Sequence, residues 1–69
     1  MEPQITVNGE PRPFRAVDLS RLLESEGVDP GRKGVAVALN GAVVPRRSWP
    51  ETALRPNDRV EIVKPFAGG

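Results

Sequence analysis

The last two residues of the chain, Gly68 and Gly69, place a carboxylate at the end of a narrow segment. Glycine has no Cβ, so such a segment can pass down a narrow channel into the active site of a partner. A carboxylate resists nucleophiles until one of its oxygens becomes a good leaving group, which attack on ATP achieves by forming an acyl adenylate. If sulfur is the next nucleophile, the product is a thiocarboxylate. The alternative is that these residues are only a poorly ordered terminus. A Gly-Gly ending, taken without the rest of the sequence, favours that interpretation.

The composition excludes most other kinds of chemistry. The 69 residues include no Cys and no His, which removes thiol nucleophiles, zinc sites of thiolate and imidazole, and an imidazole base near neutral pH. The Asp and Glu residues are scattered over an expected helix and turns, so neither an acid–base pair nor a metal site is predicted. We therefore expect a chain that is not itself an enzyme and that binds no cofactor of its own.

Charge and hydropathy argue against two large classes of partner. Ten Lys and Arg against nine Asp and Glu give a net charge of +1, and the aromatic residues are one Trp and two Phe, so a nucleic-acid interface is not expected. No apolar run approaches the length of a membrane span, and the N-terminus lacks the pattern of a secretory leader. Because there are no cysteines for disulfides, a cytoplasmic location is the expectation.

Alternating apolar residues and turn dipeptides predict several short strands. Asn8-Gly9 is typical of a tight hairpin turn, and Asn40-Gly41 ends a later strand. Pro11 and Pro13 lack backbone donors, which places the second strand at a sheet edge. The expected strands are 5–8, 12–17, 35–39, 42–44 and 59–64, and residues 46–56 form a connection anchored by Leu54 and by Trp49, which is expected in the core.

One helix is expected after the second strand. Asp18 can cap its N-terminus, leucines at positions 19, 22 and 23 form an apolar stripe, and Gly27 can provide a left-handed C-cap. The order β-β-α-β-β-β predicts an α+β domain of the β-grasp type over residues 1–65, with one helix packed on a mixed four- to five-stranded sheet, followed by a flexible tail, 66–69. The expected core is Ile5, Val7, Phe14, Val17, Leu19, Leu22, Leu23, Val35, Val37, Leu39, Leu54, Val60 and Ile62.

Five segments spread over the whole chain form a distinctive set. They are Ile5 to Gly9, Val17 to Gly27, Val35 to Gly41, Val43-Val44-Pro45-Arg46 with Trp49, and the closing Phe66-Ala67-Gly68-Gly69. Together they resemble ThiS-type sulfur-carrier proteins, which are ubiquitin-like β-grasp domains of thiamin (thiazole) biosynthesis. The Val-Pro-Arg segment with Trp49 is the most discriminating, because it separates this family from molybdopterin-synthase small subunits, which have the same fold and ending.

The resemblance implies a specific chemistry at the C-terminus. A ThiF-like adenylating enzyme would use ATP and magnesium to adenylate Gly69, with Gly68 as its slim neighbour and Phe66 and Ala67 completing the tail. Sulfur delivered through a cysteine-desulfurase-derived persulfide would then give the thiocarboxylate. A ThiG-like thiazole synthase would consume it. On this interpretation the protein is a cosubstrate that is regenerated in each cycle, and its partners carry out the catalysis.

A partner surface is predicted from the alternation of side chains along the strands. If Val60 and Ile62 of the last strand point inward, Val63 points outward, and the two alanines of the third strand share its side. Small and apolar outward side chains would form a flat patch that a partner can cover. The alternative is that they are tolerated filler on an outer face. The predicted partner surface is Ala36, Ala38, Arg46 and Val63, with Arg46 included because it belongs to the matching segment.

Other functions stay open at this point. Within the carriers, the chain could be a molybdopterin-synthase small subunit or a ubiquitin-like modifier, which an isopeptide bond to a substrate lysine would reveal. Outside them, it could be a non-covalent β-grasp binding module, because small domains of this fold also serve as interaction units. A binding module would not need its last residues, whereas a carrier would lose its function without Gly68 and Gly69.

Overall fold

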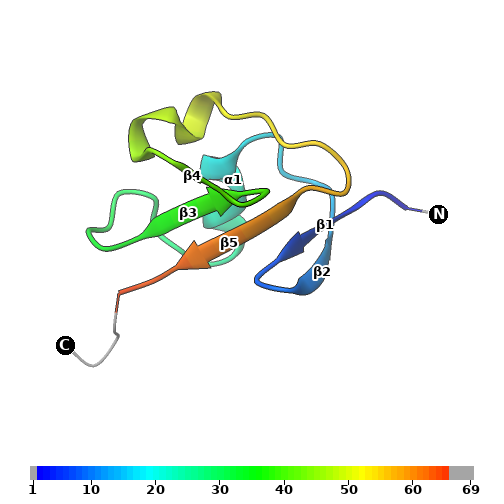
Figure 1. Ribbon diagram of the computed structural model, residues 1–69, viewed down its shortest axis with the longest axis horizontal. Helices are drawn as coiled ribbons and strands as arrows, with labels where there is room; N and C mark the ends of the chain where they lie inside the picture. The colour runs from blue at the N-terminus through cyan, green and yellow to red at the C-terminus, as the bar shows by residue number, and fades with distance from the viewer. Residues whose placement is uncertain (1, 66–69) are drawn as a thin grey trace.

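The computed structural model describes residues 2–65, and these residues form a single mixed sheet with one α-helix and one 3₁₀ helix. The sheet has five strands in the order β2-β1-β5-β3-β4, with β1 and β5 parallel and the other neighbours antiparallel (Figure 1). The predicted order of strands and helix, and the β-grasp architecture, are confirmed. The elements are β1 (Gln4–Val7), β2 (Glu10–Pro13), α1 (Leu19–Ser25), β3 (Ala36–Leu39), β4 (Ala42–Val44), the 3₁₀ helix η1 (Arg46–Glu51) and β5 (Arg59–Val63).

Both hairpins turn on an Asn-Gly pair. Asn8 and Gly9 have φ values of +51° and +83°, and Asn40 and Gly41 have values of +51° and +88°. Positive φ at both central residues defines the tight turn whose twist matches the flanking strands, and asparagine and glycine tolerate it best. The two dipeptides therefore set where β1 and β3 end.

Helix α1 is short and is capped at both ends. The Asp18 carboxylate accepts a hydrogen bond from the backbone N–H of Arg21 at 2.8 Å. At the other end Gly27 has φ +77°, and the N–H of Val28 donates to the carbonyl of Leu23 at 2.8 Å. This is the Schellman arrangement, in which the residue after the glycine also makes an apolar contact. Val28 is accordingly buried, and it joins the core.

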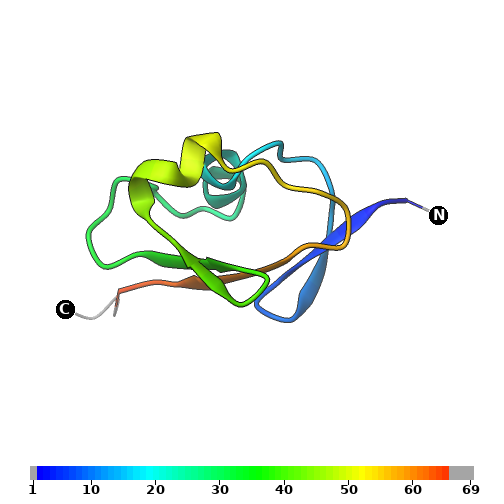
Figure 2. The ribbon, with the colours of Figure 1, turned by 45° about the horizontal axis from the view of Figure 1, so that its top comes forward.

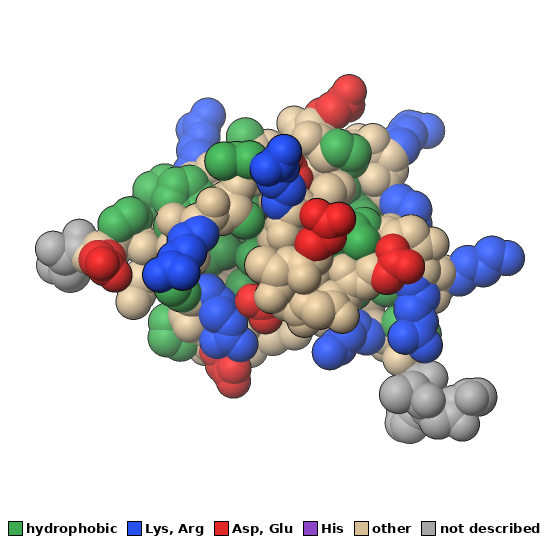
Figure 3. Space-filling view, turned by 180° about the vertical axis from the view of Figure 1, so that it is seen from behind, with side chains coloured by type: hydrophobic (Ala, Val, Ile, Leu, Met, Phe, Trp, Pro, Cys, Tyr) green, Lys and Arg blue, Asp and Glu red, His purple; other side chains and the backbone are tan. Residues whose placement is uncertain are grey.

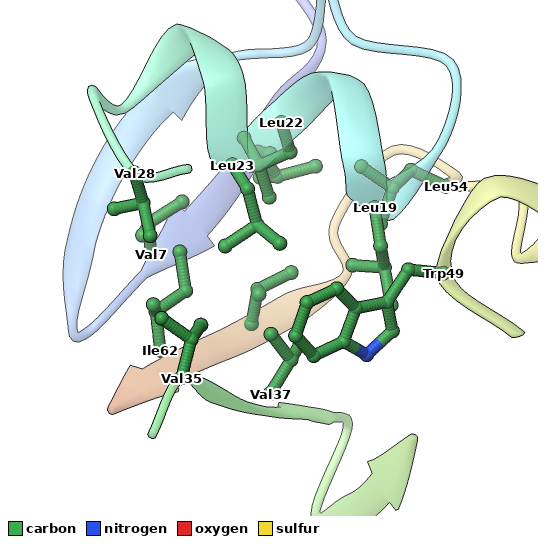
Figure 4. Close-up of a cluster of buried hydrophobic side chains, with 12 residues drawn as sticks. Val7, Leu19, Leu22, Leu23, Val28, Val35, Val37, Trp49, Leu54 and Ile62 are labelled. Atoms are coloured by element: carbon green, nitrogen blue, oxygen red, sulfur yellow. The ribbon is translucent and has the colours of Figure 1, made fainter. Parts of the chain in front are cut away.

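The core lies between the sheet and the two helices. Figure 2 shows α1 and η1 on the same side of the sheet, and Figure 4 shows the indole of Trp49 pointing in between α1 and β3. Trp49 is 2% exposed, which confirms its expected place in the core. The buried set is Ile5, Val7, Leu19, Leu22, Leu23, Val28, Val35, Val37, Trp49, Leu54, Val60 and Ile62.

Four details of the prediction need correction. Val17 was expected in the core but is 60% exposed. Burial alternates along residues 14–18, and it is the neighbouring Ala16 that packs against the core. Phe14 and Leu39 are half-buried at the margin of the core. The edge strand is Glu10–Pro13 and not 12–17, because the two-residue turn brings Glu10 directly opposite Val7. The connection 46–56 contains the 3₁₀ helix η1, which was not predicted.

Candidate functional site

Strand β5 leads directly to the predicted C-terminal segment and is the central strand of the sheet. It pairs with β1 on one edge and β3 on the other, so its backbone is held on both sides. The predicted reactive residue Gly69 and the predicted tail residues Phe66, Ala67 and Gly68 lie outside the described residues. Their predicted roles therefore stay predictions. The described part of the candidate site consists of residues that precede them in the folded body, 2–65.

The root of this segment, at Pro65, packs closely against the loop before β3. A Cβ placed on Gly34 would lie 3.0 Å from the Cβ and 3.5 Å from the Cγ of Pro65. Gly34 also has φ +89°, a backbone conformation that L side chains rarely adopt. Glycine is thus required at this position for two independent reasons, and the contact fixes where the chain leaves the body.

Three of the four predicted surface residues come together on the outer face of the sheet. In the β3–β5 register Ala36 lies opposite Val63, and Ala38 lies opposite Glu61. Ala38 also lies opposite Val43 of β4, which places Val43 on the same face. Val63 is 62% exposed and Val43 is 78% exposed. We call Ala36, Ala38, Val43 and Val63 the outer patch.

Val43 is the member of the outer patch that the sequence analysis missed. Its strand has three residues, which is too short for alternation to show which side faces the core. The signal that could have found it is the turn. Because Asn40-Gly41 forms a two-residue hairpin, Ala42 must pair with Leu39, and Val43 must then pair with Ala38.

Arg46, the fourth predicted surface residue, makes its contacts elsewhere. Its guanidinium donates hydrogen bonds to the carbonyls of Pro30 and Arg32, and it lies 5.0 Å from the centroid of the Trp49 ring. The indole N–H of Trp49 donates to the carbonyl of Val44 at 2.8 Å. Arg46 therefore ties the loop before β3 to η1, and its role as a partner contact stays a prediction.

A groove between β2 and α1 is lined in part by charged side chains, and these charges are largely paired within the chain. Arg12 contacts Glu10 at 3.2 Å and Glu26 at 3.3 Å, and its hydrogen bond to Glu10 and the charge of Glu26 raise the pKa of Arg12. Arg21 lies 3.7 Å from Asp18. Figure 3 shows the α1 side of the molecule, where basic and acidic side chains are interspersed. This face offers no continuous field of one sign for a polyanion.

The described part of the chain contains neither of two other features that would point to a different function. Within residues 2–65, no helix has both the length and the apolar character needed to cross a membrane. In the same residues, the acidic side chains do not gather into a group that could hold a metal ion.

Comparisons with known proteins agree with the fold and with the sequence pattern. The model of the ThiS family matches residues 5–69. The chain is 42% identical over 65 residues to the sulfur carrier protein ThiS of Thermus thermophilus, covering 94% of this chain and 98% of that protein. It is 40% identical over 67 residues to a thiazole synthase of Paramagnetospirillum magneticum, covering 96% of this chain and 20% of that longer protein.

Solved structures give the same result. The crystal structure of the thiamine biosynthesis protein ThiS from Geobacter metallireducens has a TM-score of 0.76 and 30% identity, covering 96% of this chain and 99% of the other. A solution NMR structure of a thiamine biosynthesis protein from the same organism has a TM-score of 0.77 and 30% identity, covering 96% and 87%. With the family model extending over nearly the whole sequence, the chain belongs to the ThiS family.

Proposed function

We propose that this protein is a sulfur carrier of thiamin biosynthesis in which Gly69 is the reacting residue. The Gly69 carboxylate attacks the α-phosphorus of ATP, which is held with magnesium by a ThiF-like enzyme, and pyrophosphate leaves. The terminal sulfur of a persulfide, delivered through a cysteine desulfurase, then attacks the carbonyl carbon and displaces AMP, which gives an acyl disulfide. A thiol reductant outside this chain, which has no Cys, cleaves the S–S bond and is oxidised to a disulfide, so that the thiocarboxylate remains and one oxygen has been exchanged for one sulfur. The observation that carries the proposal is the match to the ThiS family through residue 69.

The acceptor of the sulfur is, in this proposal, a thiazole synthase. The support is the relative from Paramagnetospirillum magneticum, which is named a thiazole synthase and contains a segment 40% identical to this chain. A carrier-like segment and a thiazole synthase thus occur in one polypeptide there. The ThiF-like activating enzyme and the desulfurase are proposed from the chemistry, because a carboxylate needs activation and the chain has no Cys to hold sulfur.

The outer patch is the surface we propose for docking of these partners. Its side chains are small or branched and apolar, and α1 and η1 cover the opposite face of the sheet. The exposed Glu61 lies on the same face, opposite Ala38. The apolar side chains around it lose water favourably when a partner with a matching face covers them. Val63 lies two residues before Pro65, so a partner on the outer patch also lies beside the root of the C-terminal segment.

Intact-mass spectrometry tests the proposal directly. The protein is incubated with ATP, magnesium, a sulfide source and a ThiF-like enzyme, next to a variant that lacks Gly68 and Gly69. We expect a mass gain equal to the exchange of one oxygen for sulfur, located at Gly69 by fragmentation and absent from the truncated variant. Circular dichroism of the truncated variant checks that its body is still folded.

Other outcomes of this experiment point to other functions. An adduct on a lysine of another protein, in place of the sulfur product, would identify a modifier. Absence of both AMP and sulfur adducts with several active ThiF-like enzymes would refute the carrier function and favour a non-covalent binding module. A product with the enzyme of molybdopterin synthesis alone would move the protein to that pathway.

A further inference from the structure

The parallel pairing of β1 with β5 continues beyond the end of β1. Two backbone hydrogen bonds form its regular part, from Thr6 N to Asp58 O and from Asn8 N to Val60 O, each 2.9 Å. The next acceptor on this edge of β5 is the carbonyl of Ile62. The chain, however, turns away at Asn8-Gly9, where β1 ends, so no further backbone group of β1 reaches it.

The side chain of Asn8 takes the place of the missing residue of β1. Its Nδ2 donates to the carbonyl of Ile62 at 3.2 Å, and its Oδ1 accepts from the N–H of Ile62 at 2.7 Å. The amide therefore satisfies both backbone groups of Ile62, which in a continued parallel pairing would bond to two different residues of β1. The successive acceptors on this edge are Asp58, just before β5, and Val60 and Ile62 on β5, and Thr6 and Asn8 satisfy all of them.

This pair of hydrogen bonds acts close to the root of the C-terminal segment. Ile62 is three residues before Pro65 and is 8% exposed, so its backbone groups have limited access to water. Without the Asn8 amide, the last part of β5 would be held on its β3 edge and, through Pro65, against Gly34. A strand end paired on one side has more freedom to move away from the sheet.

We propose that Asn8 is a positioning residue that fixes the end of β5, and thereby the direction in which the chain leaves the body at Pro65 toward the adenylating enzyme. The inference rests on the proposed function, in which Gly69 reacts in the active site of that enzyme. Holding the last described residues of β5 in one orientation increases the fraction of docked complexes in which the carboxylate meets ATP. Asn8 itself does not contact the reacting atoms and is not catalytic.

Asn40 provides a matched control for a test of Asn8. It has the same φ of +51° and is also followed by glycine. Its side chain also makes two hydrogen bonds near the start of β5. Nδ2 donates to Asp58 Oδ1 at 3.0 Å, and Oδ1 accepts from the N–H of Arg59 at 2.8 Å. These lie at the beginning of β5, away from Pro65. Asn8→Gly and Asn40→Gly thus remove similar contacts, at opposite ends of the same strand.

The experiment measures steady-state adenylation by a ThiF-like enzyme with wild type, N8G and N40G, at a temperature where all three are folded. We expect kcat of N8G to fall about three- to ten-fold below that of N40G. This is the factor by which loss of one hydrogen bond changes the equilibrium between the held and the released end of β5. The Kd of the body for the enzyme stays within about two-fold, since the outer patch is intact. Amide hydrogen exchange accelerates at Ile62 in N8G and at Arg59 in N40G.

Each remaining outcome decides between the hypotheses. Equal kcat values for N8G and N40G would overturn the role of Asn8, while a wild type that is not adenylated would refute the proposed function instead. If N8G does not fold, N8D replaces it, because aspartate tolerates positive φ and still accepts from Ile62 N–H but cannot donate to Ile62 O. N8D is then expected to lower kcat relative to N40G, and equal values would overturn the inference.

Discussion

Replacing Gly34 by alanine tests the contact that fixes the root of the C-terminal segment. At φ +89° an alanine costs about 1–3 kcal/mol. The new Cβ, 3.0 Å from the Cβ of Pro65, adds about 1 kcal/mol of overpacking. Alanine also lowers the conformational entropy of the unfolded chain, which stabilises the folded state by about 0.4–1 kcal/mol. The net expectation is a loss of about 2 kcal/mol, a large share of the roughly 3–5 kcal/mol that a domain of this size has.

Urea unfolding monitored by Trp49 fluorescence measures the effect of G34A, with G31A as its control in the same loop. Gly31 has no positive φ, and its added Cβ would be in ordinary contact, 3.4 Å from Asp29 Oδ1. We therefore expect G31A to be neutral or slightly stabilising, and G34A to lower the free energy of unfolding by about 2 kcal/mol. A G34A variant as stable as G31A would refute the reasoning from φ and the Pro65 contact.

Two further predictions concern the outer patch and the indole. Val63→Asp is expected to weaken binding to a ThiF-like enzyme about ten-fold or more, measured by calorimetry, because a carboxylate would be buried under the partner. Val17→Asp, at a valine of similar exposure away from the patch, should leave that affinity unchanged, and equal losses would contradict the docking surface. Trp49→Phe removes the donor to the Val44 carbonyl and replaces the indole near Arg46 with a smaller aromatic ring. It should lower the free energy of unfolding by about 1–3 kcal/mol in urea, and an unchanged midpoint would argue against that hydrogen bond.

Local patterns predicted most of the fold because the controlling interactions are local. Asn8-Gly9 adopts positive φ from its own sequence, and the Asp18 cap and the Gly27 C-cap each involve residues within one helix turn. Alternation placed Val60 and Ile62 inward without knowledge of their neighbours. Signals of this kind fix where elements begin and end.

The features that the sequence did not reveal depend on contacts between distant residues. Asn8 and Ile62 are 54 residues apart in the sequence. No local sequence pattern shows that the side-chain amide of a turn residue will bond to a strand so much later in the chain. The contacts of Arg46 with the carbonyls of Pro30 and Arg32 are likewise long-range. Val17 was placed on the wrong side because β2 ends at Pro13, and in the segment that follows it is Phe14 and Ala16 that pack against the core.

The arrangement of β5 fits the proposed function, in which the partners carry out the catalysis. Its inward residues anchor it in the core, both of its edges are hydrogen-bonded, and its outward Val63 belongs to the outer patch. In the proposed function, docking and delivery both depend on β5, which ends at Val63, two residues before Pro65. Because a partner that covers Val63 automatically lies next to that end, binding the body already restricts where the following residues can reach, and the chemistry is left to the partner.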